Sequence, residues 1–356
     1  MRGNLERIYV RLLRSGFQNR IFGALKGFQK KGEAYLAYCP FHEDVFPTLV
    51  IYNQKPEYFC FACGASGDWL SFLQNHVELS FQDALLLLAQ AADIDSSDVT
   101  EASWKKDLQW SHMLELAEGF FTTWLYSPAG EGCLKYLYNR GYSMTEVEGS
   151  GFGCYPGWNK TREYLLSQGL SPELVGKEIA GFLSMESVAN ALTIPYRDSC
   201  GRIMAMMARD TAMSGPEAYM PLAGMSYVSD VPYLLSRCVG KDEILMVEGF
   251  FDAMLIDRIG IMSAVSIGKN GLSASQLDTI MESGIKKCIL CLGNLPAKKQ
   301  LTLDAMTMIR ARGLDSAFLE LKEPYEDIDQ YVRKTDLHHL EHLLKKQRRL
   351  EDLLNG

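Results

Sequence analysis

The sequence has no long apolar run, although apolar residue types make up 47% of its 356 residues. A membrane-spanning helix needs about 20 consecutive apolar residues, so we expect no contact with a membrane. The N-terminal stretch MRGNLERIYVRLLR is basic and lacks the apolar core of a secretion signal. We therefore expect a cytoplasmic globular protein, whose length allows two or three domains.

Cysteine pairs for a disulfide framework are also lacking, because the nine cysteines are an odd number. Three of them fall in one short motif and six are scattered, which suits a reducing compartment. The sequence has no internal repeats and no low-complexity tract.

The sequence lacks an excess of positive charge, because 36 Lys and Arg residues face 44 Asp and Glu residues. The resulting net charge of −8 argues weakly against a nucleic-acid partner. The charge is unevenly distributed, because residues 1–31 hold eight Lys and Arg residues against the single acid Glu6. That segment carries +7, which leaves −15 for the rest of the chain. A basic arm on an acidic body is either a contact site for a polyanion or a solvated helix face, and the sequence leaves both open.

Two short pairs of metal-ligating residues stand 17 residues apart, in CPFH at 39–42 and CFAC at 60–63. Cys39, His42, Cys60 and Cys63 supply three thiolates and an imidazole, a donor set that tetrahedral Zn²⁺ prefers. Because protein fills all four positions, we expect a structural site rather than a catalytic one. The neighbouring aromatic residues either fill the core of a small domain or stack on single-stranded bases. They are Tyr35, Tyr38, Phe41, Tyr52, Tyr58, Phe59 and Phe61.

The chain changes pattern several times along its length. Strand-like stretches in residues 33–63 precede a helix in SFQDALLLLAQAADI, for which Ser80 is the predicted cap. Residues 93–103 predict a polar linker before a helix that ends near Tyr126. From Glu243 strands alternate with helices of 10–15 residues, the pattern of a parallel α/β sheet, and the tail 336–354 predicts one amphipathic helix. The expected divisions are a metal-binding domain at 1–92, a linker and helix at 93–130, a mixed α/β region at 131–240, the parallel-sheet domain at 241–334 and a C-terminal helix at 335–356.

Four stretches, in this order along the chain, carry a family likeness: YCPFHEDVFPTLVIYNQKPEYFCFACGASGDW, CLKYLYNRGYSMTEVEGSGFGCYPGW, LTIPYRDSCGRIMAMMARD and ILMVEGFFDAMLIDRIG. The first resembles the zinc-binding domain of bacterial and phage DnaG-type DNA primases. The next two resemble the start of their catalytic core and its strand pair, and the last resembles the Glu-Gly-Phe-x-Asp motif of their toprim half. The likeness runs from about residue 20 to residue 333.

The resemblance implies an α/β multidomain fold with an N-terminal zinc ribbon, a mixed α/β primase core, a toprim domain with a Rossmann-like parallel sheet, and a C-terminal helix. The implied activity is synthesis of short RNA primers on single-stranded DNA by nucleotidyl transfer, with Mg²⁺ or Mn²⁺ held by carboxylates. The implied partners are single-stranded DNA, nucleoside triphosphates and a replicative helicase, in a bacterium or encoded by a mobile element.

The toprim pattern also implies roles for four acids. Glu248 is expected to be a metal ligand or acid–base group, with Asp252 as its support. The stretch YEDIDQYV supplies Asp327 and Asp329, which the resemblance places in catalysis and in weak Mg²⁺ binding.

Three positions, in two stretches, depart from the family pattern. The strand KKCILCLG runs into Leu292-Gly293-Asn294, where the family has Asp-Gly-Asp, and Ala218 stands where it has a lysine. Leucine cannot ligate a hard cation, so we expect Mg²⁺ to bind weakly here. Arg140 and Arg209 do match the family's nucleic-acid- and nucleotide-contacting arginines.

Two interpretations therefore remain. The chain is either an active, divergent primase that uses Glu248, Asp327 and Asp329, or a catalytically degenerate module that binds DNA or a protein partner. Leu292 and Asn294 favour the second, whereas the intact acidic stretches around Glu248 and around Asp327 and Asp329 favour the first. A toprim nuclease or topoisomerase is disfavoured, because it leaves the primase-type zinc motif unexplained and a topoisomerase needs a further domain with a strand-cleaving tyrosine.

Overall fold

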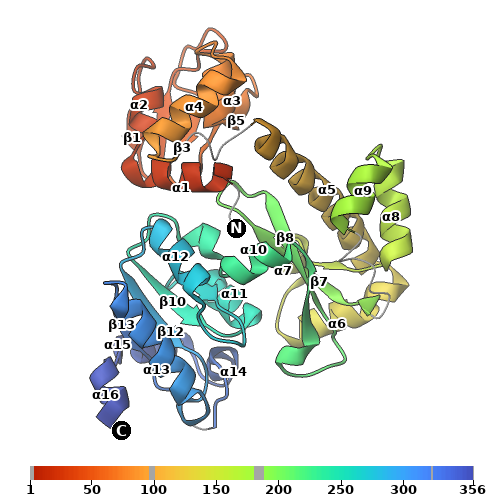
Figure 1. Ribbon diagram of the computed structural model, residues 1–356, viewed down its shortest axis with the longest axis vertical. Helices are drawn as coiled ribbons and strands as arrows, with labels where there is room; N and C mark the ends of the chain where they lie inside the picture. The colour runs from red at the N-terminus through yellow and green to blue at the C-terminus, as the bar shows by residue number, and fades with distance from the viewer. Residues whose placement is uncertain (1–3, 96–100, 180–187, 322–323, 356) are drawn as a thin grey trace. The chain divides into compact units, whose positions relative to one another are not determined.

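The computed structural model describes residues 4–95, 101–179, 188–321 and 324–355 (Figure 1). The chain divides into two compact units. The first is Lys105–Ser229, and the second combines Arg2–Trp104 with Asp230–Gly356. Part of the predicted linker, residues 96–100, lies outside the described residues.

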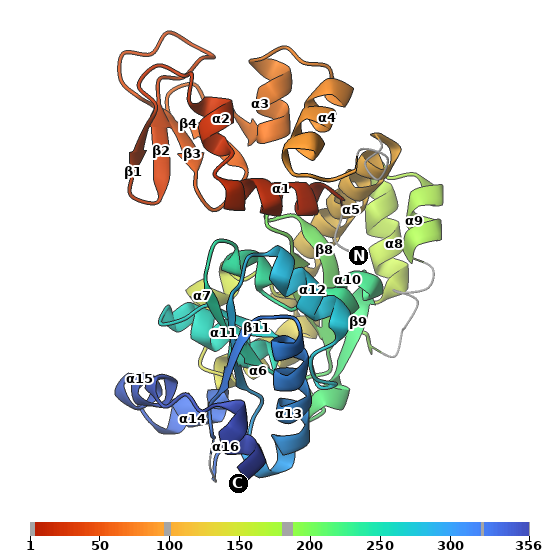
Figure 2. The ribbon, with the colours of Figure 1, turned by 60° about the vertical axis from the view of Figure 1, so that its left-hand side comes forward.

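The N-terminal part of the second unit is built on an antiparallel sheet in the order β1-β2-β3-β4-β5. Side chains alternate across it, because successive residues of a strand point to opposite faces. On β3, Leu49 and Ile51 are buried, while Val50 and Tyr52 are half-buried. Figure 2 shows helices α2, α3 and α4 beside this sheet. The strands are β1 (Gln29–Lys31), β2 (Ala34–Ala37), β3 (Leu49–Tyr52), β4 (Glu57–Cys60) and β5 (Ser66–Asp68).

The helices of this part begin where the sequence places caps. The Ser80 hydroxyl accepts a hydrogen bond of 3.1 Å from the N–H of Asp83, so the predicted cap is confirmed. Asp68 caps the preceding helix in the same way through Ser71. The helices are α1 (Asn4–Ser15), α2 (Gln18–Phe22), α3 (Trp69–Asn75) and α4 (Phe81–Ala91).

The basic N-terminal segment is more than a solvated helix face. The apolar side of α1, including Ile8, Tyr9 and Leu12, is fully buried. Next to this buried side, the Arg11 guanidinium donates to the carbonyl oxygen of Asp93 at 2.7 Å, just beyond the C-terminal end of α4. Cations stabilise that end of a helix, where carbonyl groups lack intrahelical partners. Part of the charge of this segment therefore fastens α1 to its neighbours.

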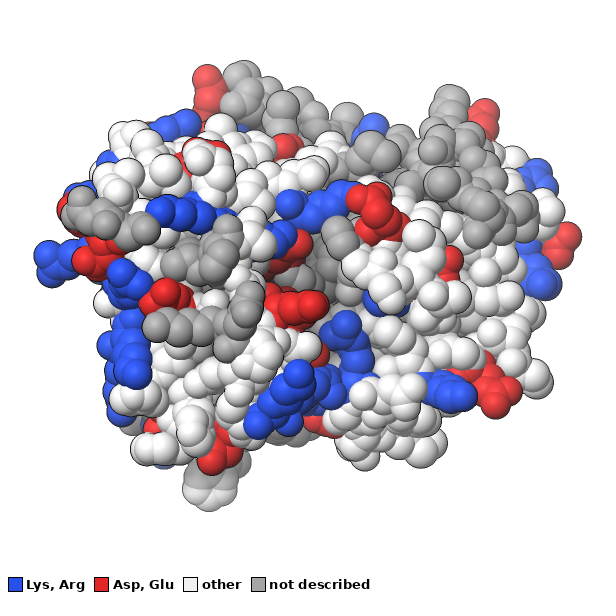
Figure 3. Space-filling model, turned by 90° about the horizontal axis from the view of Figure 1, so that it is seen from below, with Lys and Arg blue, Asp and Glu red and all other residues white. Residues whose placement is uncertain are grey.

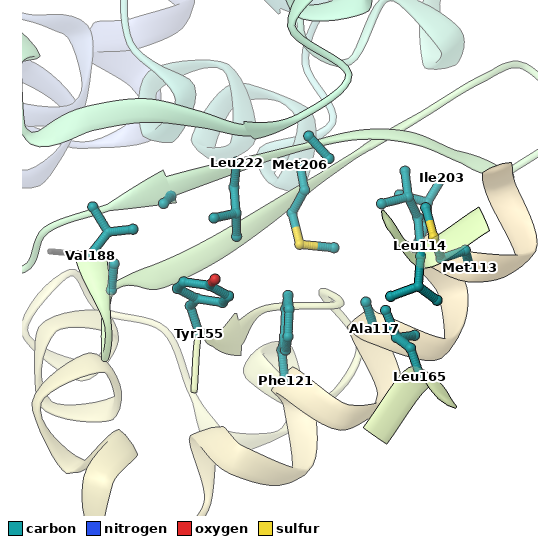
Figure 4. Packing of buried hydrophobic residues seen from close by; sticks show 14 residues of the cluster. Met113, Leu114, Ala117, Phe121, Tyr155, Leu165, Val188, Ile203, Met206 and Leu222 are labelled. Carbon is teal, nitrogen blue, oxygen red and sulfur yellow. The ribbon is translucent and has the colours of Figure 1, made fainter. Parts of the chain in front are cut away.

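The first unit holds a sheet in the order β6-β7-β8-β9, whose paired strands all run antiparallel. One face packs on the long helix α5, and Figure 4 shows Phe121 of α5 beneath Met206 and Leu222 of the sheet. Tyr155 packs edge-on against Phe121, with ring centroids 5.5 Å apart. The strands are β6 (Gly153–Cys154), β7 (Leu192–Arg197), β8 (Ile203–Arg209) and β9 (Tyr219–Ala223). The helices are α5 (Glu101–Leu125), α6 (Glu131–Asn139), α7 (Met144–Glu148), α8 (Trp158–Ser167), α9 (Pro172–Ile179) and α10 (Met225–Asp230).

The C-terminal part of the second unit contains the predicted parallel sheet, in the order β11-β10-β12-β13. Beyond their first residues its strands are mostly apolar and buried, as in other parallel sheets covered by helices. The carboxyl ends of all four strands lie at one edge, which is where ligands bind in such sheets. The strands are β10 (Glu243–Val247), β11 (Ala264–Ser266), β12 (Lys287–Cys291) and β13 (Asp315–Phe318). The helices between them are α11 (Phe250–Ile259), α12 (Ala274–Glu282) and α13 (Leu295–Ala311).

The tail differs from the single helix expected over residues 336–354. Three short helices follow the sheet: α14 (Ile328–Lys334), α15 (Leu337–Lys345) and α16 (Leu350–Asn355). Between the last two, Arg348 pairs with Phe318 of β13 through two backbone hydrogen bonds of 2.9 Å. This pairing extends the sheet and interrupts the helix, because one backbone N–H cannot serve both.

Tyr9 should be important for attaching α1 to the zinc-ribbon part. Its fully buried side chain donates to the Asp68 carboxylate at 2.8 Å, and its oxygen accepts from the N–H of Leu70 at 3.3 Å. We expect Tyr9→Phe to destabilise this part by about 1–3 kcal/mol, because buried polar groups lose their partner. Hydrogen exchange of the amides of α1 and α3 measures this. Tyr138→Phe, at an exposed tyrosine, is the control, and equal exchange in the two variants would contradict the role of Tyr9.

Candidate functional sites

The four residues expected to bind zinc lie together. Cys39, His42, Cys60 and Cys63 each offer one ligand atom, and these atoms all lie within 4.8 Å of one another. The sulfur atoms of Cys39 and Cys63 are 3.8 Å apart. Zn–S bonds of about 2.3 Å in a tetrahedral site place two sulfurs about 3.8 Å apart. The donor set and its spacing fit a structural Zn²⁺, as predicted.

The order of the sheet explains why the two pairs meet. Cys39 follows β2 and Cys60 ends β4, and alternate turns of an antiparallel meander lie at the same end of the sheet. The second pair closes tightly, because the N–H of Cys63 points at the Cys60 sulfur at 3.5 Å. Gly64 follows with φ +76°, a conformation that glycine adopts without strain.

Asp44 supports this site and was not identified from the sequence. Its carboxylate accepts hydrogen bonds from the N–H of Cys39 at 2.9 Å and the hydroxyl of Thr48 at 2.8 Å. It also lies 3.5 Å from Nε2 of His42, whose Nδ1 faces the Cys60 sulfur at 4.0 Å. Such a carboxylate orients the ring of a metal-ligating histidine. Burial raises the pKa of Asp44, but hydrogen bonds from Cys39 and Thr48 outweigh it, and the net shift is downward.

The surroundings also shift the pKa values of two of these thiols in opposite directions. Burial raises the pKa of the Cys39 thiol to about 12. At Cys60 burial also raises the pKa, but hydrogen bonds from Thr48 and from the N–H groups of Cys63 and Ala62 outweigh it and lower the pKa to about 6. Because Zn²⁺ binds thiolates, loading the site would release a proton from Cys39.

The aromatic residues of the ribbon divide between the two predicted roles. Tyr58 is buried and stacks on Phe41 at a centroid distance of 5.8 Å, and both contact Phe72 of α3. These residues form core. Phe61, in contrast, is 71% exposed and packs edge-on against Phe59 at 5.0 Å. An exposed ring of this kind is available for stacking on a base.

In the first unit, Arg140 and Arg209 both contact one ring, that of Tyr136. The guanidinium carbon of Arg209 is 4.1 Å from the ring centre of Tyr136, and that of Arg140 is 5.2 Å from the same centre. Arg209 also lies over Tyr219, its partner on β9. Burial raises the pKa of Tyr219 to about 12, so its hydroxyl stays protonated. Cation–π contacts of this kind hold the guanidinium planes in fixed orientations.

The two arginines differ in exposure. Arg209 is only 4% exposed and donates to the carbonyl oxygen of Asp210 at 2.8 Å, whereas Arg140 is half-buried. Arg140 is thus the more accessible of the pair, and its proposed contact with nucleic acid stays a prediction. Ala218, which replaces the family lysine, is fully buried beside this cluster.

At the edge of the parallel sheet, Asp252 has a structural role. One carboxylate oxygen accepts from the N–H of Gly249 at 3.2 Å, and the other accepts from the N–H of Asp329 at 3.0 Å. It therefore caps α11 and joins the first loop of this edge (248–249, after β10) to the third (325–329, after β13). The second loop (292–294) follows β12. Glu248, at the end of β10, forms an ion pair with Lys298 of α13.

The acids of the third loop are also engaged. Asp327 caps α14 by accepting from the N–H of Gln330 at 2.7 Å. Asp329 is buried and accepts from the Arg333 guanidinium at 2.8 Å. Burial, together with the nearby charges of Asp252 and Asp327, raises the pKa of Cys291, at the end of β12, to about 12.

The second loop keeps its turn without its acids. Leu292 is buried, and Gly293 has φ +117°. A Cβ at Gly293 would lie 2.6 Å from the carbonyl oxygen of Glu326, so no larger residue fits there without a backbone shift. That carbonyl accepts from the N–H of Asn294 at 2.9 Å, which ties the second loop to the third.

These donors do not fit the carboxylate cluster that the family resemblance implies for Mg²⁺. Glu248 and Asp329 each pair with a basic side chain, and position 292 has no oxygen to offer. Within the described ranges, the Cys39 cluster is the one group of three or more such ligands close enough to hold one ion. Mg²⁺ needs several oxygen ligands in near-octahedral geometry, and this edge does not converge them.

Comparison with known proteins supports the sequence motifs. A DnaG zinc-ribbon family model, described as a CHC2 zinc finger, matches residues 19–103. The chain is 28% identical over 345 residues to a DNA primase of Thermotoga maritima, covering 91% of this chain and 58% of the relative. It is 28% identical over 294 residues to a DNA primase of Synechocystis, covering 76% and 46%. The chain thus spans about half the length of these relatives.

Solved structures have a similar fold. The zinc-binding and RNA polymerase domains of the Aquifex aeolicus primase match with a TM-score of 0.60 and 20% identity, covering 95% of this chain and 85% of that one. A DnaG primase catalytic domain bound to single-stranded DNA matches with a TM-score of 0.59 and 20% identity, covering 70% and 82%. The expected α/β multidomain fold and the resemblance to DnaG-type primases are confirmed. No helix in the described part of the chain is long and apolar enough to span a membrane.

Replacing one zinc ligand should empty the zinc site. We expect Cys60→Ser to lose bound zinc, because three ligands hold the ion far less tightly than four. The ribbon should then lose order, since the ion closes two of its turns. Metal analysis of the purified protein measures this, with Cys200→Ser, at a cysteine outside the cluster, as control. Full zinc occupancy in Cys60→Ser would refute the ligand assignment.

Proposed function

We propose that the protein binds single-stranded DNA and synthesises short RNA primers on it, in the cytoplasm of a bacterium. The observation that carries this proposal is that a zinc ribbon precedes a toprim-like parallel sheet in the chain. The same chain matches a DNA primase over 91% of its length. Nucleoside triphosphates would be the substrates, and a replicative helicase is a proposed partner.

In this proposal the reaction joins a 3′-hydroxyl to the α-phosphorus of a nucleoside triphosphate. The new P–O bond forms as the bond to pyrophosphate breaks, and the hydroxyl proton must leave. Glu248 is the group proposed to take it, because its carboxylate ends β10 at the sheet edge and is partly exposed. Asp252 would hold the loop in place. Because the donors do not fit a family-type metal cluster, no step is assigned to an ion.

Binding of DNA would depend on local contacts, because the chain as a whole carries −8. Figure 3 shows Lys and Arg side chains lying next to Asp and Glu side chains on one face. The exposed ring of Phe61 is proposed to stack on a base, and Arg140 to bind a phosphate. Arg209 would support Arg140 through the shared ring of Tyr136.

A second candidate function is a module that binds single-stranded DNA without making primers. The observation in its favour is the second toprim loop, where Leu292 is buried and Lys298 already neutralises Glu248. Nothing in this arrangement impairs the zinc ribbon or the arginine pair, so DNA binding would survive the loss of chemistry. The two candidates are separated by the assay below.

Arg140 should contribute to DNA binding. We expect Arg140→Ala to weaken binding of a fluorescent single-stranded oligonucleotide and to make the dependence of log affinity on log salt shallower by about 0.7, the loss of one phosphate contact. Titrations at several salt concentrations measure both quantities. Arg162→Ala, at an exposed arginine of α8, is the control. An unchanged salt slope in Arg140→Ala would remove this contact.

Primer synthesis should depend on Glu248. On single-stranded DNA with labelled nucleotides, and with Mg²⁺ or Mn²⁺ in the buffer, we expect the natural protein to make primers and Glu248→Gln to slow synthesis by about 100-fold. Glu341→Gln, at an exposed acid of α15, should leave the rate unchanged. A natural protein that binds DNA but makes no primer would instead establish the second candidate.

The same assay tests whether the second loop is a lesion. Leu292→Asp combined with Asn294→Asp restores two acids, and we expect this variant to make primers faster than the natural protein. Its thermal stability must be measured in parallel, because a carboxylate at buried position 292 is costly without a cation. An equally folded double variant with no gain in rate would mean that the loop does not limit catalysis.

A further inference from the structure

Lys298 occupies an unusual place in the parallel-sheet part. It stands in the first turns of α13, and its ammonium group pairs with the Glu248 carboxylate at the end of β10. The two side chains are only 29% and 23% exposed, so this pair is not a surface contact between freely moving groups. Partial burial strengthens an ion pair relative to one in bulk water.

The backbone of Lys298 is held in the first turns of α13, beside the second loop. The N–H of Lys298 bonds to the Asn294 carbonyl at 3.1 Å, and its own carbonyl accepts from the Thr302 hydroxyl at 3.0 Å. A Cβ at Gly293 would lie 3.7 Å from Cγ of Lys298, so the aliphatic stem of the lysine passes over the glycine of the second loop. The stem therefore lies at contact distance from the second loop on its way to Glu248.

Other negative charge at this edge is absent or already neutralised by the protein. Leu292 is apolar and buried, and Asp329 pairs with Arg333 four residues further along α14. Glu248 and Asp329 thus each have a basic partner from the protein itself. A divalent cation that approached Glu248 would have to displace the ammonium group of Lys298 or bear its repulsion.

We propose that Lys298 is a tethered cation that holds the place of a divalent ion at Glu248 and keeps such ions out of this sheet edge. The proposal rests on the proposed function only in treating this edge as the site of primer synthesis. Metal binding at Glu248 can be measured without primer synthesis. In this proposal, Glu248 binds the ammonium group of Lys298 in preference to a divalent ion from solution.

The test is Mn²⁺ binding to the full, zinc-loaded chain, followed by the loss of the electron paramagnetic resonance signal of free Mn²⁺. We expect Lys298→Met to bind one Mn²⁺ about tenfold more tightly than the natural protein, because removing the ammonium frees the Glu248 carboxylate. Lys299→Met, at the exposed neighbouring lysine, removes the same charge and should bind as the natural protein does. The gain should vanish when Glu248→Gln is added to Lys298→Met.

Each result decides the proposal. A gain specific to Lys298→Met and dependent on Glu248 supports it. Equal Mn²⁺ affinity in the natural protein and in Lys298→Met overturns it, as does a gain that Lys299→Met shares or that survives Glu248→Gln. Circular dichroism and zinc content confirm that each variant is folded. Failure of the proposed function would be seen separately, as DNA binding without primers, and would leave the Mn²⁺ result intact.

Discussion

The carboxylate of Asp252 holds together the edge of the parallel sheet at which Glu248, Lys298 and Asp329 lie. Its two oxygens accept from backbone N–H groups of Gly249 and Asp329, which belong to segments 80 residues apart in the chain. A charged acceptor makes stronger hydrogen bonds than a neutral one, and burial makes their loss costly. Asp252 therefore fixes the distance between the first and third loops, and its side chain is committed to that task rather than open to a ligand.

Much of this arrangement follows from the sequence. The alternation of apolar strands with helices from Glu243 onward specifies a parallel sheet, and a parallel sheet brings all strand ends to one edge. The sequence also predicts the zinc ligands, which are Cys39, His42, Cys60 and Cys63. Two close pairs of Cys and His at this spacing rarely occur outside metal sites. In both cases a short local pattern determines where the residues meet.

Other features depend on which side chain reaches which, and no local pattern encodes that. Asp44 reads as one more acid in a polar turn until the fold shows it beside Nε2 of His42. Lys298 and Lys299 are equivalent in sequence, yet only the rotation of α13 decides which of them meets Glu248. The tail helix was overpredicted, because the amphipathic pattern continues through Arg348 while the backbone there pairs with β13. Tertiary hydrogen bonds outweigh helix propensity at such positions.

The replacement at position 292 and the pairing at Lys298 are best understood together. An acid at 292 would be buried at the sheet edge and would require a cation nearby, since an uncompensated buried charge costs several kcal/mol. Leucine removes that requirement, and Lys298 pairs with the Glu248 carboxylate of the first loop. At the third loop, Arg333 pairs with Asp329 in the same way, so the chain itself supplies a positive charge to each of these two carboxylates. The physical consequence is a parallel-sheet edge at which two carboxylates are paired with basic side chains of the chain itself.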